Sequence, residues 1–296
     1  MIVQPQANGV VVRAPATSAN MGPGFDCLGM ALNLWNEVEA VPGLQQPDGD
    51  QNLILRAAHA VFEQVGGAYP GFVLRCTNRI PFARGLGSSA AAIACGVLLG
   101  NHCLGGPLDE WALLQLAGRL EGHPDNVVPC LLGGIRVAAV SETGHVVQAR
   151  VPLGLSLHVV CFVPDQLIRT AHARRVLPSS VPLADALFNV ARASLLVAAL
   201  ASGQPEVIGE ATRDRLHQSY RLPLFPGGTR FLEAAMQAGA LGAFTSGAGP
   251  SVLALCAGGQ EVDAVAATFD AIAHELELAG ITLRLALSDI GAHVVG

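Results

Sequence analysis

The pattern of hydrophobic and polar positions predicts a chain of mixed strands and helices. Residues 9–14 alternate with the period of a strand, residues 34–41 form a second strand that pairs with the first, and residues 53–65 have helical spacing. A polar, Pro- and Gly-bearing loop is expected at residues 42–51. Further strands are expected at 72–77, 134–140, 146–151, 157–163, 242–244, 252–256 and 281–288, and further helices at 109–120, 183–201, 228–238 and 262–278.

Strands and helices occur in separate blocks instead of strict alternation, which favours an α+β fold in both halves of the chain. A length of 296 residues suits two domains that share a cleft, although length alone also allows one large domain. We place the boundary between residues 155 and 156, within a region from 150 to 165 where it could fall. This gives domains of residues 1–155 and 156–296.

The composition is unusually apolar, with 51% hydrophobic and 14% charged residues and a mean hydropathy of +0.45. The longest apolar runs, such as residues 90–100 and 195–201, are nevertheless shorter than the roughly 18 residues that span a bilayer, and Gly, Arg or His interrupts them. Residues 1–9 have neither the positive charge nor the apolar stretch of a signal peptide. We therefore expect a soluble cytoplasmic protein with no membrane partner.

Charge and cysteine content exclude other classes. A net charge of −6 without a basic stripe argues against nucleic acid as a partner. The seven cysteines are odd in number, widely spaced and without a CxxC pair. They are expected to be reduced thiols in the core and not a disulfide framework or a zinc site.

The most informative segment is a glycine-rich turn in front of an alanine-rich helix that ends at Gly100. Gly85 and Gly87 allow the backbone to turn with its amides exposed, and Ser88 or Ser89 is expected to cap the helix. Free N–H groups and the helix dipole favour an anion at such a helix start. Tight packing of the helix on a sheet would also explain the glycines, but the two serines and the preceding strand favour a phosphate site.

All 17 basic residues are arginine, and the chain contains no lysine. This excludes the P-loop, whose lysine reaches the β- and γ-phosphates, and the lysine-dependent phosphate site of protein kinases. A phosphoryl transfer by this chain would have to use backbone amides, hydroxyls, arginine and a metal held by carboxylates.

Two further segments concentrate polar residues and glycines. Residues 14–29 follow a strand as a loop that brings together Asn20, Asp26 and several glycines. The loop is either a turn capped by Asn and Asp side chains or, as its polarity favours, a site for an ammonium or hydroxyl group of a small substrate. Residues 242–251 are glycine-rich before a strand, which a hairpin or bulge explains equally well.

Residues 121–126, Glu-Gly-His-Pro-Asp-Asn, leave two interpretations open. Pro-Asp-Asn is turn chemistry in its own right, so the segment can be a surface connection. Alternatively Glu121 supplies the carboxylate that a phosphate-bound Mg²⁺ needs, and Asn126 faces the substrate.

Together these four segments resemble the GHMP kinases, and the resemblance covers nearly the whole chain. Residues 81–91 are similar to the family's PxxxGLGSSA nucleotide loop, and residues 242–251 are similar to its third motif. Residues 17–29 and 121–127 resemble the homoserine kinases within that superfamily. The resemblance implies the GHMP kinase fold, with a ribosomal-protein-S5-like N-terminal domain that has a left-handed crossover, a ferredoxin-like C-terminal domain, and ATP and substrate bound between them.

The reaction that the resemblance implies is transfer of the γ-phosphate of ATP to the side-chain hydroxyl of L-homoserine, giving O-phospho-L-homoserine for threonine biosynthesis. The implied substrate residues are Asn20, Asp26, His123, Asn126, Thr170, Arg174 and Arg221. The implied nucleotide residues are Asn52, Pro81, Phe82, Ala83, Arg84, Gly85, Leu86, Gly87, Ser88, Ser89, Ala90 and Ala91. Ser89 (or Ser88) and Glu121 match the family's Mg²⁺ positions, and Asn126, Glu121 and Ser89 form the implied catalytic set.

The resemblance also implies that catalysis uses no dedicated base, so that positioning and charge neutralisation lower the barrier. It suggests a homodimer. Two alternatives remain at this stage: a GHMP kinase for another small alcohol, such as mevalonate or a sugar, and a catalytically silent relative. The combination of Asp26 with two arginines favours a zwitterionic substrate, and the retained phosphate loop and magnesium positions argue against a silent relative.

Overall fold

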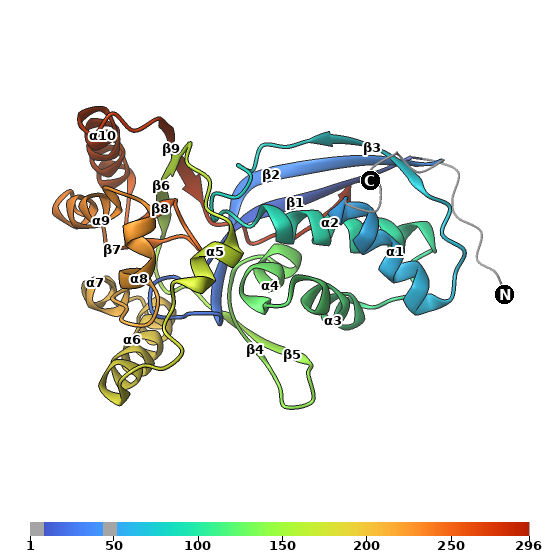
Figure 1. Cartoon of the computed structure of the whole chain (residues 1–296), viewed down its shortest axis with the longest axis horizontal. Coiled ribbons are helices and arrows are strands. Elements are labelled where there is room, and N and C mark those ends of the chain that lie inside the picture. Colours follow the sequence, from blue (N-terminus) through green and yellow to red (C-terminus); the bar gives the residue numbers. More distant parts are fainter. Residues whose placement is uncertain (1–8, 44–51, 296) are drawn as a thin grey trace.

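The computed structural model describes residues 9–43 and 52–295, so most of the loop expected at residues 42–51 lies outside the described residues. The first half of the chain and the C-terminal strand β10 form an antiparallel sheet with strand order β10-β1-β2-β4-β5, in which β3 also pairs with β2 (Figure 1). Its strands are β1 (Val10–Ala19), β2 (Leu28–Pro42), β3 (Phe72–Thr77), β4 (Ile135–Val140), β5 (Val146–Val151) and β10 (His293–Val295). The helices beside this sheet are α1 (Leu53–Val65), α2 (Ser88–Cys103), α3 (Glu110–Glu121) and α4 (Pro124–Leu132).

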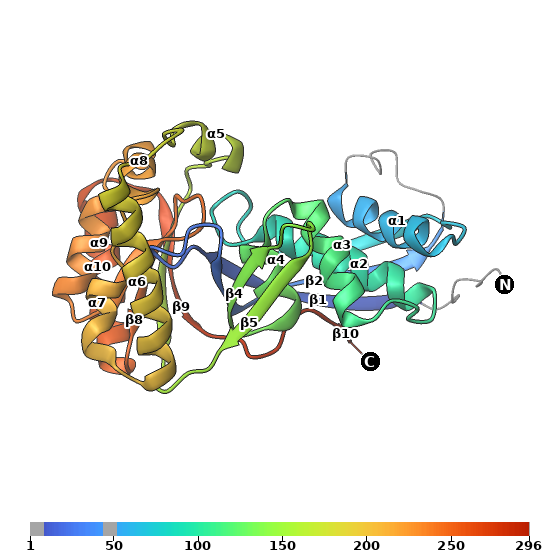
Figure 2. The ribbon, with the colours of Figure 1, turned by 90° about the horizontal axis from the view of Figure 1, so that it is seen from below.

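The second half is built on an antiparallel sheet of order β7-β8-β6-β9, with helices grouped around it (Figures 1 and 2). Its strands are β6 (His158–Pro164), β7 (Gly242–Thr245), β8 (Val252–Cys256) and β9 (Gly280–Ala286). Its helices are α5 (Thr170–Arg175), α6 (Leu183–Ser202), α7 (Ile208–Ala211), α8 (Gln218–Arg221), α9 (Gly228–Gln237) and α10 (Gly259–Glu275). The order of strands and helices along the chain is that of a ferredoxin-like unit. The expected α+β class is therefore confirmed.

The chain passes from the first sheet to the second and returns to the first at its end. The last strand of the first block, β5, ends at Val151, and β6 begins the second sheet at His158. The chain then returns to the first sheet at its end, because Val294 of β10 pairs with Val12 of β1. The proposed division between residues 155 and 156 stays a prediction about domains, and the C-terminal strand crosses it.

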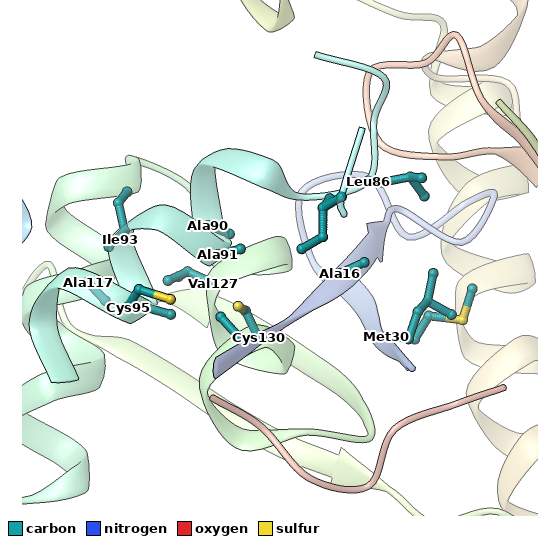
Figure 3. Close-up of a cluster of buried hydrophobic side chains, with 14 of the residues drawn as sticks. Ala16, Met30, Leu86, Ala90, Ala91, Ile93, Cys95, Ala117, Val127 and Cys130 are labelled. Carbon is teal, nitrogen blue, oxygen red and sulfur yellow. The ribbon is translucent and has the colours of Figure 1, made fainter. Parts of the chain in front are cut away.

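Helix α2 lies in the centre of the first half and carries the glycine-rich turn at its start. Small residues let it approach its neighbours: a Cβ on Gly96 would lie 2.3 Å from the carbonyl oxygen of Ile54 in α1. Figure 3 shows the resulting core, in which Ala90, Ala91 and Cys95 face Val127 and Cys130 of α4 near Ala16 of β1. This packing holds the N-terminal turns of α2 against α4 and β1.

Two strands are longer than the sequence pattern indicates. Residues 15–19 and 28–29 were expected in a loop, and residues 30–33 were assigned to no element, yet all of them belong to β1 and β2. Pairs such as Ala16 with Leu32 and Ser18 with Met30 bury these residues on both strands. Only residues 20–27 form the connecting turn.

Helix α6 corrects one expectation from composition. It has 20 residues, and the mean hydropathy of an 18-residue window within it is 1.6, so it is long and apolar enough to cross a membrane, which we had expected of no segment. A single such helix is weak evidence for a span. Polar side chains of α6 also bond to residues that follow the helix in the chain: Asn189 donates to Asp214, and Asp185 pairs with Arg215.

All seven cysteines are free thiols, as expected. Five of them are buried, and burial raises the pKa of Cys95 to about 12 and that of Cys103 to about 11. Cys76 departs from the expectation of core thiols because it is exposed on β3.

Candidate active site

The start of α2 leaves backbone donors free for an anion. Gly87 is the residue before the helix, has φ +69°, and makes no side-chain cap. The expectation that Ser88 or Ser89 caps the helix is therefore wrong, since both are helical residues themselves. The first backbone bond of the helix joins Ala91 N–H to the Gly87 carbonyl at 2.9 Å, so the N–H groups of residues 88–90 have no partner within the helix.

The turn needs glycine because the backbone of Ser246 and the side chain of Thr17 lie directly against it. A Cβ on Gly85 would lie 2.2 Å from the Ser246 carbonyl oxygen, and one on Gly87 would lie 1.9 Å from Thr17 Oγ1. Ser246 Oγ donates to the Gly85 carbonyl at 2.6 Å. The third glycine-rich segment, for which a simple hairpin was an alternative, thus packs on the turn from the second half of the chain.

Ser89 and Glu121 are brought together at the end of this turn. Ser89 Oγ donates to Glu121 Oε2 at 2.8 Å, across 32 residues. Burial raises the pKa of Glu121, and the Ser89 hydrogen bond partly opposes that effect. A hydroxyl and a carboxylate side by side are ligands that suit Mg²⁺. This ion binds few protein oxygens and takes its remaining ligands from phosphate and water. No cluster of three or more His, Cys, Asp or Glu that could hold a metal occurs within residues 9–43 and 52–295.

The turn between β1 and β2 joins the two halves of the chain. Asn20 and Asp26 both have positive φ, +71° and +58°. Asn20 Oδ1 accepts from the Asp26 backbone N–H at 3.0 Å, while its Nδ2 donates to the Gly247 carbonyl at 2.8 Å. One buried amide therefore fixes both the turn and its contact with the third glycine-rich segment.

Asn126 is oriented by a residue that the sequence analysis did not single out. Thr17 Oγ1 donates to Asn126 Oδ1 at 2.8 Å. Asn126 lines a first cavity together with Asp26, Ser89 and Arg174. Because Thr17 holds its oxygen, the Nδ2 group of Asn126 is the donor that remains for a ligand there. The neighbouring His123 Nδ1 lies 3.1 Å from Asp125 Oδ1, and this hydrogen bond raises the pKa of His123.

The second half supplies two arginines. Arg174, on α5, forms two hydrogen bonds with the carboxylate of Asp26, at 2.9 and 2.8 Å. Arg221, on α8, is only 4% exposed and donates to the carbonyls of Ala173 and Gly247. Burial lowers the pKa of Arg221 to about 10, and the nearby Arg174 adds to that effect.

His217 forms a hydrogen bond with Arg221 and holds its guanidinium in place. Its Nδ1 lies 3.2 Å from Arg221 Nη1, and its Nε2 lies 2.7 Å from the Gly22 carbonyl. Since the guanidinium can only donate, Nδ1 is the acceptor and Nε2 carries the proton. Phe25 stacks on His217 with 5.1 Å between ring centroids, and the guanidinium groups of Arg174 and Arg221 lie over the Phe25 ring.

A second, more apolar cavity adjoins the start of α2. It shares Ser88 and Ser89 with the first cavity and extends to Asn36, Asn52 and Cys76. Asn52 Oδ1 accepts from the first N–H groups of α1, and Asn36 Oδ1 accepts from the N–H groups of Arg79 and Ile80. Both side chains thus retain an NH₂ donor for a ligand. The start of α2, with its free N–H groups, lies where the two cavities meet.

Most of the expected site residues border these cavities. The first is lined by Asn20, Asp26, Ala83, Gly85, Gly87, Ser88, Ser89, Glu121, His123, Asn126, Thr170, Arg174 and Arg221, and the second by Asn52, Phe82, Ser88, Ser89 and Ala91. Four expected nucleotide residues border neither cavity: Pro81, Arg84, Leu86 and Ala90. Leu86 and Ala90 are core side chains, and Arg84 donates to the carbonyls of Phe82, Pro164 and Asp165, so it braces the loop.

Thr17, Asn36, Asp125 and His217 were missed as site residues. Thr17 and Asp125 lie within segments that the sequence analysis did examine, and polar residues at those positions were the available signal. Asn36 lies in an expected strand and had no local signal of its own, whereas His217 lies four residues before Arg221, in the stretch that the resemblance matched.

Comparisons with known proteins show the family of the chain. The GHMP kinase N-terminal domain matches residues 52–134, and the GHMP kinase C-terminal domain matches residues 196–273. The homoserine kinase of Moorella thermoacetica is 45% identical over 84% of this chain and 88% of its own length. The homoserine kinase of Desulfitobacterium hafniense is 40% identical over 97% of this chain and 100% of its own length.

Solved structures match over nearly the full chain. The crystal structure of homoserine kinase from Cytophaga hutchinsonii has a TM-score of 0.89 at 28% identity and covers 100% of both chains. L. major mevalonate kinase has a TM-score of 0.73 at 17% identity, covering 97% of this chain and 98% of its own, and this supports the fold alone. The expected GHMP kinase fold is confirmed, and the chain belongs to the homoserine kinase family within the GHMP kinases.

Proposed function

We propose that this chain transfers the γ-phosphate of ATP to the side-chain hydroxyl of L-homoserine, giving O-phospho-L-homoserine for threonine biosynthesis. The observation that carries the proposal is the first cavity, where a helix start with free N–H groups faces Asp26, Arg174 and Arg221. A phosphate donor and an amino acid each find complementary charge there, within reach of one another. The homoserine kinases to which the chain is similar support the choice of substrate.

ATP is assigned to the two adjoining cavities. The apolar second cavity takes the base, with the amides of Asn36 and Asn52 as donors, and the phosphates lie at the N-terminus of α2. Ser89 and Glu121 would hold Mg²⁺, whose charge offsets that of the phosphate oxygens when it is bound. Arg84, Leu86 and Ala90 would contribute only through backbone.

L-Homoserine is assigned to the first cavity. Asp26, fixed by Asn20, would receive the ammonium group, and Arg174 with Arg221 would receive the carboxylate. Thr170, at the start of α5, lines the same end of the cavity. The hydroxyl would then point toward His123 and Asn126, beside the γ-phosphate.

We assign no dedicated base to this transfer, as the resemblance to the homoserine kinases implies. The Nδ2 group of Asn126 is a donor and cannot accept the hydroxyl proton. The substrate oxygen bonds to the γ-phosphorus as the bond to the β,γ-bridging oxygen breaks, and the proton passes to a phosphoryl oxygen. A loose transition state tolerates late deprotonation, so alignment and charge neutralisation supply most of the catalysis.

Two further points stay predictions. A cytoplasmic location rests on the sequence analysis alone. Assembly as a homodimer is proposed as well, and the exposed Leu183, Leu187 and Val190 of α6 form an apolar stripe on which a second copy could pack. Sedimentation of the purified protein would test the dimer.

The test of function is ADP release from ATP and Mg²⁺ by purified protein. L-Homoserine is compared with L-serine, L-threonine, mevalonate and galactose as acceptors. Turnover that depends strongly on L-homoserine supports the proposal. Preference for mevalonate or galactose would instead indicate a GHMP kinase for another alcohol, and ATP binding without turnover on any acceptor would indicate a silent relative.

A further inference from the structure

The two charged groups assigned to opposite ends of the substrate are bonded to each other. Arg174 Nη1 and Nη2 donate to Asp26 Oδ2 and Oδ1, so the guanidinium and the carboxylate face each other through two hydrogen bonds. Both side chains line the first cavity and are 37% and 36% exposed. An ion pair that is this open to water contributes little to folding, so a ligand can separate it at small cost.

Asp26 is the fixed partner and Arg174 is the movable one. The backbone of Asp26 is held by Asn20, independently of Arg174. Helix α5, which carries Arg174, has only six residues. Two further hydrogen bonds join α5 and the residues just before it to the rest of the protein, and both are long. Arg221 Nε donates to the Ala173 carbonyl and the Ile168 N–H donates to the Ala83 carbonyl, each at 3.3 Å.

The guanidinium of Arg221 attracts a ligand carboxylate into the cavity. Its hydrogen-bond partners are all neutral, namely the carbonyls of Ala173 and Gly247 and the imidazole of His217. Within the described part of the chain, no Asp or Glu oxygen lies within 4.0 Å of its guanidinium. A buried cation with no carboxylate bonded to it favours an incoming anion. A carboxylate that reaches Arg221 also attracts Arg174, which then leaves Asp26 free for an ammonium group.

We propose that substrate binding exchanges the internal Asp26–Arg174 pair for ion pairs with the ligand, and that this exchange selects ligands carrying both charges. The inference rests on the proposed function, because it takes the ligand to be an α-amino acid. An ammonium group alone must displace Arg174 and leave it unpaired beside Arg221. A carboxylate alone leaves Asp26 unpaired. The internal pair is thus a competitor that every singly charged ligand must overcome without full compensation.

Calorimetric affinities of the full chain test the exchange. The ligands are L-homoserine, 3-aminopropanol, which lacks the carboxylate, and γ-hydroxybutyrate, which lacks the ammonium group. Arg174→Met and Asp26→Asn should each weaken L-homoserine by about tenfold or more. Arg174→Met should strengthen 3-aminopropanol by about two- to fivefold, and Asp26→Asn should do the same for γ-hydroxybutyrate, because each variant removes the internal competitor.

The matched control is Arg175→Met, which removes the same charge from an exposed neighbour on α5. It should leave all three affinities unchanged, and an equal gain for 3-aminopropanol would assign the effect to general charge and overturn the exchange. Unchanged or weaker binding of the singly charged ligands in both pair variants would overturn it too. In either case the proposed function stands as long as the wild-type protein binds and phosphorylates L-homoserine; absence of that binding would defeat both.

Thermal unfolding of each variant accompanies the titrations. The two pair variants test the exchange independently, so a folding defect in one leaves the other decisive. Because both side chains are partly exposed, we expect both variants to fold.

Discussion

Thr17 Oγ1 donates a hydrogen bond to Asn126 Oδ1 at 2.8 Å, and Thr17 is fully buried. The two residues are 109 positions apart, one on β1 and the other on α4. The bond decides which end of the Asn126 amide faces the cavity. It leaves the Nδ2 group of Asn126 as the donor for a ligand in the first cavity.

We expect Thr17→Val to lower kcat by roughly 10- to 100-fold while the KM for ATP changes little, because the amide of Asn126 loses its fixed orientation. Thr17→Ser keeps the hydroxyl and should restore most of kcat. Steady-state kinetics of both variants make the comparison. Equal losses in Thr17→Ser and Thr17→Val would mean that packing and not the hydrogen bond matters.

The Ser89–Glu121 contact predicts a change in metal demand. Glu121→Ala should raise the Mg²⁺ concentration for half-maximal activity by about tenfold or more, since a carboxylate ligand is lost. Glu110→Ala removes an exposed carboxylate at the other end of α3 and serves as the control. A Mg²⁺ titration in which both variants behave like the wild-type protein would remove Glu121 from the metal site.

Gly85 should tolerate no side chain. Its φ is +80°, and a Cβ would meet the Ser246 carbonyl, so Gly85→Ala should cost about 2 kcal/mol or more of the free energy of unfolding. Gly66 has a similar φ of +78° with open space around it, so Gly66→Ala should cost only about 1 kcal/mol. Urea denaturation measures both. Similar losses would show that the close contact at Gly85 is relieved by movement of the loop.

Two histidines of the site predict opposite pH dependences of stability. Burial lowers the pKa of His217, with Asp214, Arg221 and Asp26 as the charged groups around it. Its neutral form is preferred in the folded state, so its contribution is complete above its ordinary pKa of about 6.5 and is lost as the pH falls below it. The hydrogen bond to Asp125 raises the pKa of His123, whose contribution is present below about 6.5 and is lost as the pH rises through the raised value.

Melting temperatures between about pH 5.5 and 8 check this expectation. Relative to wild type, the destabilisation caused by His217→Gln should shrink toward low pH, and that caused by His123→Gln should shrink toward high pH. Parallel curves for the two variants would contradict the assigned protonation states.

Local signals in the sequence predicted the elements that surround the site but not the contacts that complete it. Residues 53–65 and 72–77 match α1 and β3 because each has a regular apolar period and a clear end. Helix α4 was missed because it contains Pro129 and follows a segment interpreted as a turn, although Pro124 at its first position is a typical helix start. Strand β10 has only three residues and is defined by its pairing with β1.

The site shows the same division. Glycines and serines before an apolar helix indicated the turn and the free helix start that we assign to phosphate, because both the turn and the helix are local. The internal Asp26–Arg174 pair joins residues 148 positions apart, and no pattern along the chain reports such a contact. The cap at Gly87 was misassigned because serine is the commoner residue at that position, whereas the close approach of Thr17 requires glycine.

The central claim is that this chain phosphorylates the side-chain oxygen of L-homoserine. The most direct measurement is ³¹P NMR with mass spectrometry of the product formed from ATP, Mg²⁺ and L-homoserine. We predict one new phosphate monoester signal, a mass gain of one phosphoryl group on L-homoserine, and a matching amount of ADP. Release of inorganic phosphate without phosphorylated L-homoserine would contradict the account.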